Sequence, residues 1–314
     1  MGGHALTVMV LAGGPDRERP VSQMSGAQVA AALRQAGHEV LQRDVLPQDL
    51  SALDEFARWG GSGGDVIFPV LHGGWGEGGP LQHILDMRGL PYVGCSGPVA
   101  ELCMDKHHTK MALEQAGLPT PPYELLAVGQ RRTIPPPVVI KAPCEGSSID
   151  LAICHDADSA RKARKRLRRR GKLLVERFIA GKEMTVGVIG KARPVAGYQT
   201  LPPIRIVPAA SFYDYDAKYH RDDTRYLFEL NQIGLSQGVL DELDRLALET
   251  HRVLGCRHLS RVDFIVDEQD QPWILEVNTM PGFTAHSLLP MPGAHAGLPL
   301  PALVDRLVRL AADK

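Results

Sequence analysis

The chain has 314 residues, of which 44% are hydrophobic and 23% charged, with 35 lysines and arginines against 36 aspartates and glutamates. A formal net charge of −1 and 32 glycines are typical of a soluble globular enzyme with two or three cores, and they exclude a disordered or fibrous chain. The five cysteines lack a C-x-x-C spacing, which argues against a disulfide framework or a zinc site and fits a reducing cytoplasm.

The first third of the chain is predicted to alternate strands and helices. The expected elements are strands over 7–14, 39–45 and 65–71, a helix over 22–36 and a further helix around Leu81. A strand, a helix and a strand in succession are typical of a parallel α/β unit. We therefore expect a first domain over residues 1–104.

Two further domains are predicted, over residues 105–182 and 183–314. The expected elements are helices over 106–116, from Ser236 and around Leu303, Leu307 and Leu310, and strands over 138–141, 173–178, 184–189, 203–208 and within 261–278. No stretch approaches the roughly 20 apolar residues of a membrane span, and the N-terminal apolar run lacks a signal-peptide pattern. We expect a cytoplasmic protein without membrane insertion.

Oxygen ligands gather on the hairpin predicted within residues 261–278. Glu276 and Asn278 share a face because side chains two apart on a strand point the same way, and the hairpin brings Asp263 close to them. Two carboxylates and an amide suit a hard cation such as magnesium. An acidic, solvated hairpin is the alternative. The neighbouring Arg261 and the turn that contains Gly282 favour a functional site.

The central region contains a second cluster of candidate binding residues, around Lys141. Lys141 lies at the end of the predicted strand over 138–141. A Gly-Ser-Ser turn over 146–148 follows, and its backbone amides and hydroxyls can contact an anion. Such a turn by itself is equally typical of an ordinary hairpin. Together with the cation site it indicates a nucleotide triphosphate bound between two domains.

Across nearly its whole length the sequence resembles the D-alanine:D-alanine ligases of the ATP-grasp superfamily. The matching segments are Gly13-Gly14 with Glu18 and Val21-Ser22, 71–79, 104–106, 145–148, 212–219, 261–263 and 275–288. The resemblance implies a mixed α/β and α+β fold: a Rossmann-like N-terminal domain, a small central domain, and a C-terminal domain, with ATP between the last two.

The resemblance also implies which residues bind ATP and metal. Lysines would bind the phosphates, and a loop that contains two serines would cover them. The segment that connects the last two domains would contact adenine and ribose. The implied ATP-binding residues are Lys106, Lys141, Ser147, Ser148, Glu176, Phe178, Ile179, Glu183 and Lys218. Asp263, Glu276 and Asn278 match the family's ligands for magnesium or manganese, with two ions expected. Glu183 could equally be a simple strand-end acid.

The implied reaction joins two D-alanines through an acyl phosphate to give a peptidoglycan precursor. Arg261 and the Gly282 amide match donors to the oxyanion, and Glu18 matches the acid that receives the first substrate's ammonium group. His72 lies near the first substrate in the family, and Ser287 and Leu288 match contacts to the second substrate. A helix-terminal acid and a loop-capping histidine are the alternatives for Glu18 and His72.

The segment from Phe212 to Tyr219 matches the family's closing loop, in which Tyr219 joins Glu18 and Ser147 over the substrate. Tyr219 favours a dipeptide product over the ester made by some relatives. Asp150 stands where a glycine is usual, and the segment over 127–137 is short, which puts the phosphate loop's conformation in question.

Three alternatives remain at this stage. The chain could be another ATP-grasp ligase, such as a depsipeptide ligase, or a silent nucleotide-binding or amino-acid-binding sensor; the presence of Arg261 and the metal ligands argues against the sensor. The basic run over 161–170 could indicate nucleic acid, but a solvated helix face explains it more simply. We expect no nucleic-acid partner, D-alanine as substrate, and a homodimer through the N-terminal domain, as the family implies.

Overall fold

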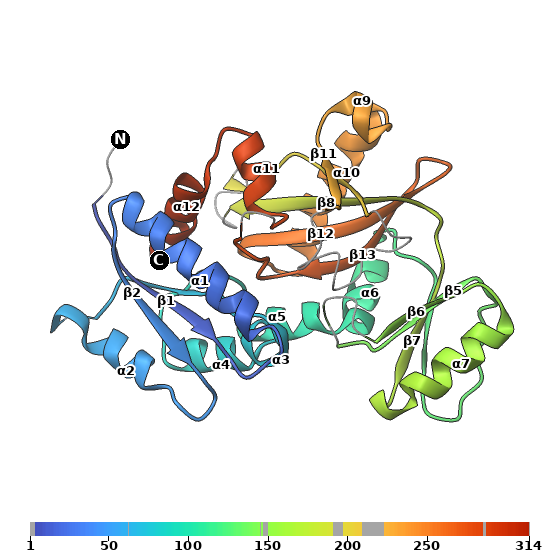
Figure 1. Cartoon of the computed structure of the whole chain (residues 1–314), viewed down its shortest axis with the longest axis horizontal. Coiled ribbons are helices and arrows are strands. Elements are labelled where there is room, and N and C mark those ends of the chain that lie inside the picture. The colour runs from blue at the N-terminus through green and yellow to red at the C-terminus, as the bar shows by residue number, and fades with distance from the viewer. Residues whose placement is uncertain are drawn as a thin grey trace.

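A computed structural model describes residues 4–61, 63–144, 146, 150–190, 197–208, 223–284 and 287–313, and contains three sheets that follow one another along the chain (Figure 1). The first is parallel, in the order β2-β1-β3, with β1 at Thr7–Gly13, β2 at Glu39–Val45 and β3 at Val66–Pro69. Its helices are α1 (Arg19–Gln35), α2 (Ser51–Arg58), α3 (Gly73–Gly76), α4 (Pro80–Met87) and α5 (Gly97–Met104). The predicted α/β unit is thereby confirmed.

The central sheet is antiparallel, and helix α6 (Lys106–Gln115) leads into it. Its order is β4-β7-β5-β6, with β4 at Tyr123–Leu126, β5 at Val138–Lys141, β6 at Leu151–Cys154 and β7 at Leu173–Arg177. Helix α7 (Ala157–Leu167) continues into a 3-10 turn over Arg168–Arg170. Ala160, Ala163 and Leu167 bury the apolar side of α7 against one face of the sheet, while most of the basic side chains are exposed. The basic run is therefore a solvated helix face, as predicted.

The third sheet is also antiparallel and contains the predicted acidic hairpin. Its main order is β11-β10-β8-β12-β13, and β9 pairs with β8. The strands are β8 (Gly181–Gly190), β9 (Gln199–Thr200), β10 (Ile204–Val207), β11 (Arg225–Leu227), β12 (His258–Asp267) and β13 (Pro272–Asn278), and the helices are α9 (Leu230–Ile233), α10 (Gln237–Val253), α11 (Pro290–His295) and α12 (Leu300–Ala312). Ser236 caps α10 by accepting a hydrogen bond from the Val239 N–H.

A bulge in β13 controls which side chains face the site. Val262 pairs with Val277, Asp263 with Glu276 and Phe264 with Ile274, so Leu275 is left without a partner of its own on β12. Strict alternation would place Glu276 on the same face as the buried Ile274. The extra residue reverses this, so Ile274 and Val277 enter the core while Glu276 and Asn278 face the opposite side.

The last helix returns to the first sheet. Leu303, Val304, Leu307 and Val308 of α12 belong to one buried cluster with Val8 and Phe68, and α12 lies beside α1 (Figure 1). The His38 Nδ1 accepts from the Leu6 N–H at 3.1 Å, so its Nε2 carries the proton and donates to Asp305 at 2.8 Å. The domain boundaries at 104 and 182 remain a prediction.

We predict that Asp244→Asn stabilises the protein in a pH-dependent way. Asp244 lies on α10, its Oδ1 is buried without a hydrogen-bond partner among the described residues, and burial raises its pKa from 3.8 to about 6. The folded state therefore keeps a proton that the unfolded chain loses, so this group destabilises the fold increasingly as pH rises from about 4 to 6. Asparagine mimics the neutral form and should add about 1–2 kcal/mol at pH 7.5.

Urea unfolding at two pH values provides the check. The variant and the parent should have nearly equal free energies of unfolding at pH 4, where the parent's Asp244 is protonated in the fold. A gain at pH 4 as large as that at pH 7.5 would contradict a charge-based cause.

Candidate active site

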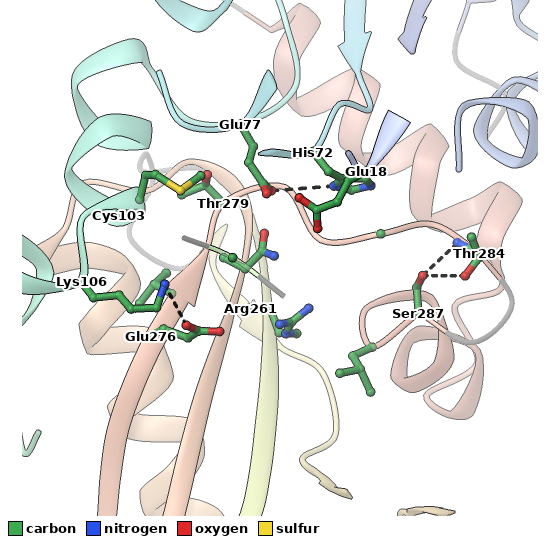
Figure 2. A pocket seen from close by; sticks show the side chains of 16 residues that line it. Glu18, His72, Glu77, Cys103, Lys106, Arg261, Glu276, Thr279, Thr284 and Ser287 are labelled. Carbon is green, nitrogen blue, oxygen red and sulfur yellow. Dashed lines mark hydrogen bonds and ion pairs between the residues drawn. The ribbon is translucent and has the colours of Figure 1, made fainter. Parts of the chain in front are cut away.

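Side chains from all three sheet regions surround one cavity of about 110 Å³ (Figure 2). The N-terminal region supplies one wall, α5 and α6 a second, and β12, β13 and the segment after β13 the rest. The lining residues are Glu18, His72, Glu77, Cys103, Met104, Lys106, Gly146, Arg261, Glu276, Val277, Asn278, Thr279, Gly282, Thr284, Ser287 and Leu288. Nine residues with predicted roles are among them: Glu18, His72, Lys106, Arg261, Glu276, Asn278, Gly282, Ser287 and Leu288.

The N-terminal wall carries two acids and a histidine. Glu18 occupies the N-cap position of α1 but makes no capping hydrogen bond with its side chain, which is buried and lines the cavity. His72 follows β3, is 5% exposed, and has its Nδ1 3.8 Å from Glu77 Oε2, an ion-pair distance rather than a hydrogen bond. The His72 side chain makes no capping hydrogen bond to helix α3.

The electrostatic setting of His72 favours its charged form. Burial by itself lowers the pKa of His72, but the carboxylates of Glu77 and Glu18 outweigh it, and the net direction is upward. Its Nε2 is buried without a hydrogen-bond partner among the described residues. A histidine in this state can present a positively charged donor to an anionic group in the cavity.

One face of the third sheet carries the polar side chains predicted from the hairpin. Arg261 is directly opposite Asn278, and Asp263 is opposite Glu276, so all four share a face. Arg261 donates to both Asp263 oxygens, through Nε at 2.8 Å and Nη2 at 2.7 Å, which fixes the plane of the guanidinium at the cavity wall. Lys106 Nζ lies 3.2 Å from Glu276 Oε2. Burial lowers the pKa of Lys106, but Glu276 more than offsets this and raises it.

The donor set on this face fits a hard cation. Asp263 Oδ1 accepts from Thr185 Oγ1 at 2.6 Å as well as from Arg261, whereas Oδ2 accepts a single hydrogen bond from the described residues, that of Arg261. Asn278 Oδ1 accepts from the Met280 N–H at 2.8 Å. Within the described ranges no three His, Cys, Asp or Glu side chains form a metal site by themselves. Two carboxylates and an amide would leave positions for phosphate and water oxygens, as magnesium commonly requires.

The segment after β13 is held against α1. The Phe283 N–H donates to Ser25 Oγ at 3.2 Å, and the Phe283 ring packs edge-on against Phe68 with centroids 5.3 Å apart. The Ser287 hydroxyl lies 2.9 Å from Thr284 Oγ1 and accepts from the Thr284 N–H at 3.0 Å. Gly282 lies close to it, because a Cβ at Gly282 would lie 2.7 Å from Ser287 Oγ.

The residues predicted to bind the nucleotide lie between the central and third sheets. Lys141 Nζ is 2.8 Å from Glu176 Oε2, and both residues are buried. Phe178 and Ile179 follow β7, and Glu183 lies on β8, opposite Ile265 of β12. These five residues do not line the cavity of Figure 2. Their contacts to a nucleotide remain predictions.

Several predicted residues lie outside the described ranges, namely Ser147, Ser148, Lys218 and Tyr219. Other residues with evident contacts in the site were not predicted. Glu77 faces His72, Thr185 binds Asp263, Thr284 binds Ser287, and Lys110 forms an ion pair with Glu176 at 3.0 Å. Lys110 lies one helical turn after Lys106 on α6, and that spacing was the available signal.

Comparison with known proteins identifies the family. Family models described as the D-ala D-ala ligase N-terminus and C-terminus match residues 48–95 and 112–309. The chain is 41% identical over 297 residues to D-alanine–D-alanine ligase B of Chromobacterium violaceum, covering 93% of each chain. It is 39% identical over 314 residues to the D-alanine–D-alanine ligase of Bordetella avium, covering 98% of this chain and 94% of the relative.

The chain belongs to the D-alanine–D-alanine ligase family. Solved structures agree: the Bacillus anthracis ligase complexed with ATP superposes with a TM-score of 0.80 at 28% identity, covering 98% of this chain and 97% of that chain. The Coxiella burnetii ligase gives a TM-score of 0.81 at 25% identity, covering 99% and 95%. The predicted ATP-grasp fold is confirmed. Among the described residues of this family member, no helix is long and apolar enough to cross a membrane.

We predict that the His72 imidazole titrates above its ordinary value of 6.5 and that Glu77→Gln lowers its pKa. Glutamine removes the carboxylate that raises this pKa most, so burial is offset less. NMR titration of the His72 ring protons in both proteins provides the measurement. An unchanged His72 midpoint would contradict the role given to Glu77.

Proposed function

We propose that this protein joins two D-alanine molecules to D-alanyl-D-alanine, with conversion of ATP to ADP and phosphate, for peptidoglycan precursor synthesis. The observation that carries the proposal is the single cavity in which Glu18, Arg261, Gly282 and Ser287 meet the polar face of the third sheet. Membership of the ligase family supports the same activity.

The first step would activate a carboxylate. The carboxylate of one D-alanine attacks the γ-phosphorus of ATP, an acyl phosphate forms, and ADP leaves. Two lysines would contact the phosphates. They are Lys106, which lines the cavity, and Lys141, which ends β5 of the central sheet. Glu18 would accept the ammonium group of this D-alanine, with His72 and Glu77 beside it.

The second step would form the peptide bond. The amine of the second D-alanine attacks the acyl carbonyl, and phosphate leaves as the tetrahedral intermediate collapses. Arg261 and the Gly282 N–H would donate to the oxyanion; Asp263 holds the Arg261 guanidinium rigid, as such a donor requires. Ser287 and Leu288, which line the same cavity, would contact the second substrate's carboxylate end.

Magnesium, or manganese, is part of this proposal, with Asp263, Glu276 and Asn278 as its protein ligands and two ions expected. When bound, the metal would neutralise the phosphate charge during transfer. We also propose a homodimer through the N-terminal domain and a cytoplasmic location, both on the basis of the family. The prediction that the product is a dipeptide rather than an ester is based on Tyr219, which lies outside the described residues.

The test is phosphate release with D-alanine, ATP and magnesium, with the product identified by mass. D-alanyl-D-alanine should appear in a one-to-one ratio with phosphate, stop on chelation of the metal and return when magnesium is restored. Replacing the second substrate with D-lactate or other amines tests the alternative ligases. ATP and D-alanine binding without turnover would instead indicate a sensor and would reject the proposal.

We predict that Gly282→Ala raises the KM for the second D-alanine by roughly tenfold while leaving the KM for ATP nearly unchanged. The added methyl group would lie 2.7 Å from Ser287 Oγ, so the hydroxyl must move and its contacts with Thr284 must change. Gly238→Ala is the matched control, because its methyl group would meet only Ser236 Oγ, at an ordinary 3.9 Å. Initial rates with each substrate varied in turn, at a saturating concentration of the other, decide the matter; an equal effect on the KM of both substrates would contradict this placement of Gly282.

A further inference from the structure

Lys110, Glu176 and Lys141 form a buried charge cluster behind the cavity. Lys110 is 0% exposed and Glu176 is 2% exposed. The Lys110 Nζ lies 3.0 Å from Glu176 Oε1, and the Lys141 Nζ lies 2.8 Å from Oε2. Each oxygen of the carboxylate therefore has its own ammonium partner.

Lys110 also joins the two sheets that enclose the proposed nucleotide site. Its Nζ donates to Thr120 Oγ1 at 2.6 Å, and that hydroxyl donates to the Ile274 carbonyl of β13 at 2.9 Å. One turn earlier on α6, Lys106 reaches Glu276 of the same strand. Helix α6 thus directs one lysine to the third sheet and the next to the central sheet.

The two lysines that share Glu176 differ in exposure and in their other partners. Lys110 is enclosed and has two fixed partners, so it cannot turn to a phosphate without leaving Glu176 and Thr120. Lys141 is 7% exposed and ends β5 directly before the segment that contains the predicted phosphate loop. A single carboxylate between two ammonium groups also leaves an excess positive charge, which suits an incoming polyanion.

We propose that Lys110 is a positioning residue: it remains the fixed partner of Glu176 and so allows Lys141 to leave that carboxylate and contact the nucleotide phosphates. This inference rests on the proposed function, because it takes ATP as the ligand of Lys141.

The proposal predicts a specific pH dependence when Lys110 is lost. Burial raises the pKa of Glu176, but Lys110 and Lys141 outweigh it and hold the pKa below the ordinary value. In Lys110→Met the ionised carboxylate has Lys141 as its remaining ion-pair partner, and ATP must compete for that lysine because a buried unpaired charge is costly. Loss of Lys110 removes one of the two cations that lower the Glu176 pKa, so this pKa rises in the variant, and acid protonates more of the carboxylate and releases Lys141. The KM for ATP should therefore rise more at pH 8.5 than at pH 6.0.

The other titratable groups around this carboxylate do not produce the same trend. They are Lys106 from the start of α6 and Tyr123 from β4, whose ring centroid lies 5.5 Å from the Lys110 Nζ. Glu114 accepts from the Tyr123 hydroxyl at 2.9 Å, and this neighbour and burial raise the Tyr123 pKa to about 12. Tyr123 therefore stays neutral between pH 6.0 and 8.5, and Lys106, whose pKa is also raised, stays charged.

The experiment compares, within each protein, the ratio of the KM for ATP at pH 8.5 to that at pH 6.0, with saturating D-alanine. Lys110→Met should raise this ratio roughly five- to tenfold over the wild type. In Lys110→Met/Glu176→Gln, which has no carboxylate to hold Lys141, the ratio should return to the wild-type value. Thr120→Val removes the other Lys110 hydrogen bond but keeps the ion pair, so its ratio should not change.

Each outcome decides the proposal. A wild-type ratio in Lys110→Met, or a raised ratio in the double variant, would overturn it. Lys110→Met could fail to fold. In that case a double variant that folds and has the wild-type ratio supports the role proposed for Lys110. A double variant that also fails to fold overturns that role. If the wild-type protein releases no phosphate in the presence of ATP and D-alanine, the proposed function itself is rejected. This result is distinct from a wild-type KM ratio in Lys110→Met, which rejects only the role of Lys110.

Discussion

The bulge at Leu275 is the constraint on which the site depends. Strand β13 must bury Ile274 and Val277 in the core and present Glu276 and Asn278 on the opposite face, which regular alternation cannot do because the two core positions are three residues apart. One unpaired residue resolves the conflict. In a regular strand that paired Leu275, Glu276 and Asn278 would turn toward the apolar core beneath α10.

The charged groups of the site lie in low-exposure surroundings, and the two lysines of α6 are each paired with a carboxylate on a sheet. Lys106 on α6 meets Glu276 on the third sheet, Lys110 on α6 meets Glu176 on the central sheet, and His72 after β3 meets Glu77 before α4. Removing one partner from such a buried pair is far more damaging than replacing both. Helix α6 is therefore the element that sets the relation between the two sheets that enclose the proposed nucleotide site.

The sequence predicted correctly that Glu276 and Asn278 share a face, because both lie on one side of the bulge, where the two-residue period applies. Their role as metal ligands remains a prediction. It could not predict the bulge itself, since Leu275 has no glycine or proline to mark it. Lys110 and Thr185 were missed because their partners are distant in sequence, 66 and 78 residues away, and periodicity reports only local faces. The roles of Ser147, Ser148, Lys218 and Tyr219 came from resemblance alone and remain predictions.

The packing of α12 against the first sheet has a consequence for synthesis of the chain on the ribosome. The apolar side of α1 and the face of β1 and β3 beneath it share their core with residues 303–308 and with Phe283. The parallel sheet can therefore form its strands early but cannot exclude water from this face until residues 303–308 have been translated. Until then the nascent N-terminal region exposes apolar surface, which makes it a natural substrate for chaperones that bind such surfaces.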